Sequence, residues 1–296
     1  MNALPYDQWR DTLQTLHMWT QVIGKIQLAL APPVNHWWHI AQRVTPRGLT
    51  TGSLPHGDRT FGIDLDFVEH VCRVVVSDGD EARIPLRPMP VAEFHDRLVG
   101  ALDERGLHVD FWRRPVEVVD PIPFHEDRVH RSYAAGDVAR SFRELAGADR
   151  ILRRFRGEFI GKSSPVHFFW GSFDLAVTRF SGRRAPPHPG GFPNLADWVT
   201  REAYSHEVFS AGWWPGSEVF PKPAFYAYAY PEPEGFADAA VPAEATYLPD
   251  LGEFVLPWPG DGETGPGEED VLAFLRSAYA AAAHLGGWDR DALERR

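Results

Sequence analysis

The hydrophobic pattern of this chain switches between a helical and a strand period, and the same order of elements occurs twice. Apolar residues spaced by three and four from Trp9 to Leu30 predict an amphipathic helix that ends before Pro32 and Pro33. Aromatic and β-branched runs at 35–51, 60–70 and 71–77 predict antiparallel strands. A second helix is expected over 91–105, because Pro90 precedes it and Gly106 follows it.

The second part of the chain repeats this order. A helix whose apolar face runs from Phe142 to Phe159 begins after Asp137, a residue type that caps helix starts. Strand-like runs follow at 166–180, 206–213, 225–230 and 252–256. A last helix is expected over 268–285, ended by two glycines.

The junctions between first helix and first strand also match. VIGK at 22–25 precedes PVNHWW at 33–38, and FIGK at 159–162 precedes PVHFFW at 165–170. Loop insertions and deletions explain the unequal spacers. We therefore predict an α+β fold of two diverged helix/antiparallel β-meander/helix units, residues 1–133 and 134–296, which share one core with pseudo-twofold symmetry. The alternative is that aromatic strand starts arose twice independently.

Charge and composition exclude several functions. With 41 acidic against 30 basic residues the net charge is −11, which disfavours nucleic-acid binding because phosphates need a basic surface. The single Cys72 excludes an internal disulfide and favours a reducing compartment. MNALPYDQWR does not resemble a signal peptide, and no apolar run is long enough to span a membrane. We expect a cytoplasmic monomer or homodimer that binds a small cationic or neutral molecule, and neither nucleic acid nor membrane.

The second unit carries the fullest set of reactive side chains, namely Lys162, His167, Asp174, His206 and Glu207. His167, His206 and Glu207 are ligand types that Fe, Mn or Zn accepts, although no compact ligand spacing accompanies them. In a metal-free alternative, His167 or His206 is a general base, a carboxylate such as Asp174 or Glu207 orients it, and Lys162 stabilises developing negative charge. Both histidines could also be hydrogen-bonded residues of an aromatic core.

Lys25 and Lys162 are two of only three lysines, and each follows an Ile-Gly pair that is expected to end a helix. They could cap those helices or bind an anion or carbonyl group. The histidines of the HWWH segment at 36–39 are expected on an extended strand, where residues three apart point to opposite faces and do not converge.

Four further residues are candidates for contacts with a ligand in a pocket between the units. Tyr226 and Tyr228 share one face of an expected strand, and Trp170 lies among the aromatic residues of another. Arg179 could bind a carboxylate or phosphate through two parallel hydrogen bonds. Cross-strand packing of the tyrosines and ion pairing of the arginine are the alternatives.

The segments NHWWH, SPVHFFWGSFDLAVTRFSG, REAYSHEV and YAYPEPEGF, within 35–236, resemble those of a bacterial family of unknown function found in actinobacteria and cyanobacteria. The resemblance covers nearly the whole chain and implies no reaction. From the residues themselves we predict an enzyme that acts on a small organic molecule, by metal-assisted or acid-base chemistry. The alternative is a non-catalytic binding protein with an aromatic cavity.

Overall fold

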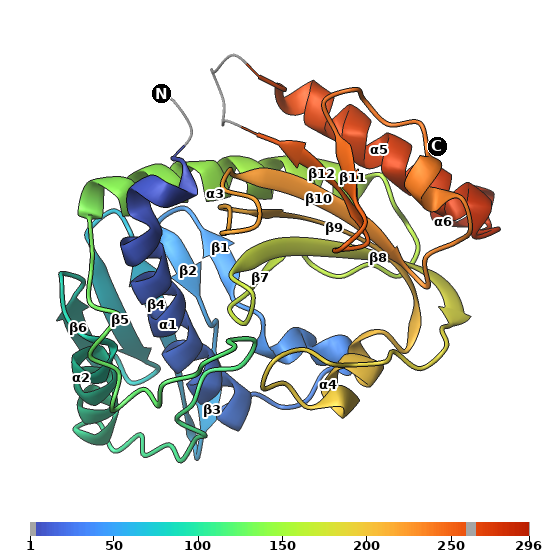
Figure 1. Cartoon of the computed structure of the whole chain (residues 1–296). Coiled ribbons are helices and arrows are strands. Elements are labelled where there is room, and N and C mark those ends of the chain that lie inside the picture. Colours follow the sequence, from blue (N-terminus) through green and yellow to red (C-terminus); the bar gives the residue numbers. More distant parts are fainter. Residues whose placement is uncertain (1–3, 259–264, 296) are drawn as a thin grey trace.

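A computed structural model describes residues 4–258 and 265–295 and contains two antiparallel sheets flanked by helices (Figure 1). The first part comprises α1 (Tyr6–Leu30), η1 (Asn35–Ile40), β1 (Arg43–Thr45), β2 (Gly48–Thr50), β3 (Leu54–His56), β4 (Arg59–Asp66), β5 (Val71–Val76), β6 (Glu81–Pro85) and α2 (Val91–Asp103). The second part comprises α3 (Ala135–Gly157), β7 (His167–Phe169), β8 (Asp174–Arg184), α4 (Asp197–Ala203), β9 (His206–Trp214), β10 (Ala224–Tyr230), η2 (Phe236–Asp238), β11 (Thr246–Leu248), β12 (Glu253–Pro257), α5 (Glu268–Leu285) and α6 (Arg290–Leu293).

Both sheets are built largely from strands that follow one another in the chain. The first has the order β1-β2-β4-β5-β6, with β3 also paired to β4, and the second has the order β11-β12-β10-β9-β8-β7. All the pairings between these strands are antiparallel. The predicted α+β class is confirmed, whereas the pseudo-twofold symmetry stays a prediction.

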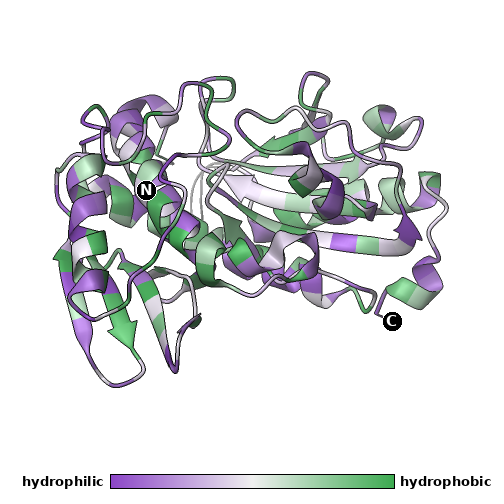
Figure 2. Ribbon diagram, turned by 90° about the horizontal axis from the view of Figure 1, so that it is seen from below, coloured by the Kyte–Doolittle hydropathy of each residue, from purple (hydrophilic) through white to green (hydrophobic). Residues whose placement is uncertain are grey.

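The two sheets share a continuous core. Buried residues of both, together with the inner faces of α1, α3 and α5, belong to one hydrophobic cluster. The sheets also meet directly, because the backbones of Gln42 and Phe168 exchange hydrogen bonds of 2.8 and 2.9 Å. Hydrophobic and hydrophilic residues alternate along the helices and strands, as one-sided burial requires (Figure 2). Among the described helices, none combines the length and apolar character of a membrane span.

The two junctions that match in sequence differ in structure. Lys25 lies inside α1, five residues before its end at Leu30, whereas Lys162 lies in the connection that follows α3. The expectation that both lysines follow a helix end is therefore wrong for Lys25. Its helix continues because apolar side chains of α1, such as Ile26, remain buried beyond this point.

The HWWH segment is not the expected strand. It forms the short helix η1, in which His36 and Trp37 adopt left-handed backbone conformations with φ of 59° and 63°. Its contacts run to α4: the His36 Nδ1–H donates to the Ala203 carbonyl at 3.0 Å, and the rings of Trp37 and Trp198 lie 5.2 Å apart. These tertiary contacts override the strand preference of tryptophan.

Candidate functional site

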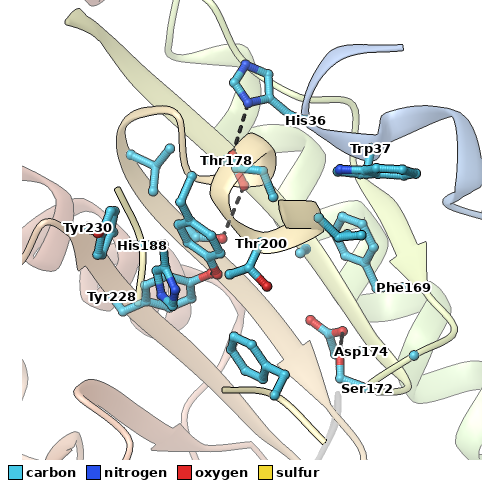
Figure 3. A pocket seen from close by; sticks show the side chains of 18 of the residues that line it. His36, Trp37, Phe169, Ser172, Asp174, Thr178, His188, Thr200, Tyr228 and Tyr230 are labelled. Atoms are coloured by element: carbon cyan, nitrogen blue, oxygen red, sulfur yellow. Dashed lines mark hydrogen bonds between the residues drawn. The ribbon is translucent and has the colours of Figure 1, made fainter. Parts of the chain in front are cut away.

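A pocket of about 850 Å³ lies between the second sheet and the segments that contain η1 and α4 (Figure 3). Residues of β8, β9 and β10 form one wall, and residues 188–204 form the opposite one. Aromatic rings cover much of its surface, among them Trp37, Trp38, Phe169, Trp170, Phe180 and Trp214. The volume and apolar walls are typical of a small-molecule site.

The alternation of β8 decides which side chains enter the pocket. Asp174, Ala176, Thr178 and Phe180 line it, while the residues between them face the helices on the other side of the sheet. On the neighbouring strand Gly212 leaves room for a phenol, because a Cβ there would lie 2.3 Å from the Tyr226 ring and hydroxyl. The face of the second sheet that lines the pocket therefore carries polar side chains and has space for large ones.

Four carboxyl groups reach the pocket from different segments: Glu117 from the connection after α2, Asp174 from β8, Glu232 from the connection after β10 and Glu253 from β12. Glu232 accepts a hydrogen bond of 2.6 Å from the Tyr247 hydroxyl. Asp174 is buried and accepts hydrogen bonds from the Ser172 hydroxyl at 2.7 Å and from the Tyr226 hydroxyl. Glu253 is only 8% exposed, and its carboxyl group has no hydrogen bond or ion pair within the described residues.

The pKa values of Glu117, Asp174 and Glu253 are strongly shifted. Burial raises the pKa of Glu117 to about 7 and that of Glu253 to about 8, and the charge of Asp174 adds to both shifts. Burial also raises the pKa of Asp174. Lys25, which is 5% exposed, has its pKa lowered to about 8 by burial, an effect that Glu117 opposes. The pocket therefore contains groups that gain and lose protons near neutral pH.

Glu117 is held in place by its surroundings. Its backbone is left-handed, with φ of 57°, and its N–H donates to the Pro193 carbonyl at 2.8 Å. The carboxyl group occupies the space that a side chain at position 171 would need, since a Cβ on Gly171 would lie 2.0 Å from Glu117 Oε1. The proline-rich sequence around Glu117 gives no periodic signal that could have identified it.

Phenol groups complete the polar part of the pocket. Tyr204 and Tyr228 hydroxyls lie 2.6 Å apart, and Tyr226 bonds to Asp174. Burial raises the pKa of Tyr204 and of Tyr226 well above the ordinary value, so both stay protonated donors. In the view of Figure 3 Asp174 lies at one end of the pocket and His36 at the other.

Four of the residues predicted from sequence line this pocket, namely Asp174, Trp170, Tyr226 and Tyr228. Sequence reasoning missed Glu117, Glu232, Glu253 and Tyr204. It considered Lys25 as a helix cap or as a group that binds an anion or carbonyl, and Lys25 also lines the pocket. A signal existed for Glu253, because it is the one acid at the start of the apolar run EFVL at 253–256.

The proposed metal ligands do not come together. The His167 ring is fully buried, 4.6 Å from the ring of Phe169. His206 and Glu207 are consecutive on β9 and so point to opposite faces; Glu207 binds Ser181 Oγ at 2.8 Å on the face away from the pocket. Across residues 4–258 and 265–295, no group of three or more His, Cys, Asp or Glu could hold a metal ion. These residues therefore do not form the predicted centre.

Lys162 and Arg179 also lie outside the pocket wall. Lys162 Nζ donates to His36 Nε2 at 2.8 Å, and it lies 5.6 Å from the ring centre of Trp38. Arg179 is on the opposite face of β8, 2% exposed, with its guanidinium carbon 3.5 Å from the ring centre of Phe155. The structure gives Arg179 contacts within the core and Lys162 a contact that orients a pocket residue.

Replacing His167 with leucine is expected to improve stability in acid. Burial, and to a smaller extent the charge of Arg43, lower the pKa of His167 to about 3, so between pH 6.5 and pH 3 this residue is protonated mainly in the unfolded chain. Its contribution to stability therefore falls as pH decreases below 6.5, by about 2 kcal/mol at pH 5.

At pH 8 the leucine variant should be at least as stable as the wild type, since neither nitrogen of His167 has a hydrogen-bond partner in the described chain. Urea unfolding at pH 8 and pH 5 measures both free energies. An equal pH dependence for variant and wild type would contradict this account.

The sequence comparisons agree with the resemblance noted above. Searches of curated proteins and of solved structures gave no significant match. A family model described as "Family of unknown function (DUF5996)" matches residues 1–295, so the chain belongs to this family.

Proposed function

We propose that the protein is an enzyme that acts on a small organic molecule by general acid-base catalysis in the pocket between the second sheet and α4. The observation that carries this proposal is the pair Asp174 and Glu117, two carboxyl groups in one apolar cavity, in which the charge of Asp174 raises the pKa of Glu117. Pairs of titratable groups held in different environments are how enzymes separate an acid from a base.

The surroundings of the two carboxyl groups suggest their roles. Burial raises the pKa of Asp174, which makes its carboxylate a stronger proton acceptor, while hydrogen bonds from Tyr226 and Ser172 oppose that shift and fix its direction. Asp174 is therefore suited to remove a proton. Glu117 has a pKa raised to about 7, so much of it is protonated at neutral pH and able to donate. The aromatic walls would hold the apolar body of the substrate and exclude water.

Changing Asp174 to asparagine is expected to reduce turnover about 10²-fold to 10⁴-fold, because the proton acceptor is lost while the shape is kept. The measurement is NMR of a mixture of cellular small molecules incubated with catalytic amounts of protein. Wild-type protein should consume at least one component in large excess over its own concentration. Glu93→Gln, at a partly exposed position of α2 where the carboxylate pairs with Arg97, is the matched control and should keep full activity.

Binding without turnover would support the alternative function. If wild-type protein binds a component one to one and never consumes it, the protein is the non-catalytic binding protein with an aromatic cavity. Equal turnover by Asp174→Asn and wild type would leave a catalyst but remove Asp174 from its mechanism.

A further inference from the structure

The charges and rings of the pocket indicate the class of its ligand, an inference that rests on the function proposed above. We propose that the ligand is an organic cation, an amine or quaternary ammonium compound with an apolar body, and that its positive group lies among Glu117, Asp174 and Glu253.

Glu253 is the first reason. The residue is 8% exposed, lines the pocket, and has no side-chain hydrogen bond or ion pair in the described chain. A buried carboxyl group without a partner is costly, and it is stabilised when an opposite charge or a donor arrives. A ligand ammonium group provides both.

The balance of charge in the pocket is the second reason. Glu117, Asp174, Glu232 and Glu253 contribute four carboxyl groups, whereas Lys25 is the only lysine or arginine among the described residues that line the pocket. The Lys25 charge acts on Glu117, and no arginine or lysine is coupled to Glu253 or Asp174. An anionic ligand would be repelled here, while a cation would restore the balance.

Aromatic rings beside these carboxyl groups are the third reason. Trp214 and Tyr226 are stacked with ring centres 5.3 Å apart, and Tyr226 and Tyr228 with ring centres 6.1 Å apart. The middle ring donates its hydroxyl hydrogen to Asp174. Aromatic faces attract ammonium groups, and this attraction grows when water is excluded. Rings and carboxyl groups therefore favour the same kind of ligand.

Binding of a cation should become tighter as pH rises from 6 to 8. A positive ligand favours ionised carboxyl groups, so Glu117 and Glu253, with pKa values of about 7 and about 8, release protons on binding. Lys25 loses its own proton near pH 8 and stops competing for the carboxylates. The facing phenols Tyr204, Tyr226 and Tyr228 stay protonated throughout because their pKa values are raised.

Three probes of equal length test the charge requirement: 4-phenylbutylamine, 4-phenylbutanol and 4-phenylbutanoate. Affinities are measured by calorimetry and by tryptophan fluorescence, since Trp37, Trp170 and Trp214 line the pocket. We expect the amine to bind about tenfold more tightly than the alcohol, and the carboxylate not to bind detectably. Amine affinity should fall about tenfold from pH 8 to pH 6, and calorimetry in two buffers should show proton release.

The variant Glu253→Gln should lower amine affinity about tenfold and leave alcohol affinity unchanged, with Glu93→Gln as the control. If Glu253→Gln fails to fold, the comparison of the three probes on wild-type protein decides alone. Equal or tighter binding of the alcohol or the carboxylate would overturn the cationic ligand and retain a small-molecule pocket. Consumption of an uncharged or anionic compound in the NMR mixture would also overturn the cationic ligand and retain the pocket. No binding of any probe and no consumed compound would overturn this inference and the proposed function together.

Discussion

Alanine at position 24 is expected to lower the free energy of unfolding by about 3 kcal/mol, the upper part of the range for overpacked cores. Gly24 lies in α1 directly against Trp170, and a Cβ there would lie 2.2 Å from two atoms of the indole ring. The ring has little freedom to move, because it is 2% exposed and its Nε1–H donates to the Ile40 carbonyl at 2.8 Å. Since Trp170 lines the pocket, the same change should also weaken ligand binding.

Urea unfolding followed by circular dichroism measures this loss. Gly100→Ala on α2 is the matched control, because nothing lies within 4 Å of the added Cβ. Alanine is the better helix former there, and we expect a gain of about 0.5 to 1 kcal/mol. A loss below about 1 kcal/mol for Gly24→Ala would show that Trp170 repacks freely and that the contact does not define the pocket wall.

Arg179→Ala is expected to cost about 3 kcal/mol of stability, a typical value for removing a large buried side chain. The guanidinium carbon lies 3.5 Å from the ring centre of Phe155 and 4.4 Å from that of Tyr279, and the group donates to the Phe155 carbonyl at the end of α3. Burial lowers the pKa of Arg179 to about 10, so the group is still charged at pH 7 and attracted to both rings.

Arg179→Met separates packing from charge, because methionine keeps much of the length and loses the cation. We expect it to recover about half of the loss seen with alanine. Thermal and urea unfolding provide the comparison. Probe binding should be unchanged in the methionine variant, because Arg179 does not line the pocket. A selective loss of ligand binding with unchanged stability would restore the ligand-contact role expected from sequence.

Much of the secondary structure followed from hydrophobic spacing. The last helix was expected over 268–285, and α5 occupies Glu268–Leu285 because its periodic apolar face ends at two glycines. Tyr226 and Tyr228 were correctly placed on one strand face by alternation alone, and both line the pocket. Local patterns succeed where a residue's position depends on its own helix or strand.

The pocket depends on contacts that local patterns do not contain. Glu117 and His36 take left-handed conformations that only packing against distant segments maintains. His206 and Glu207 are adjacent in sequence, yet the pleat of β9 sends them to opposite faces. Grouping the histidines and acids of the second unit therefore suggested a metal centre, while the carboxyl groups that do share a cavity come from four separate segments.

The cavity walls have a mixed origin: Lys25, His36 and Glu117 precede residue 134, and Asp174, Tyr226 and Glu253 follow it. A fragment ending at residue 133 would lose the sheet that forms one wall, and a fragment beginning at 134 would lose the buried amine and one of the acids. The cavity therefore exists only when both halves are present, and the family model likewise covers both, over residues 1–295.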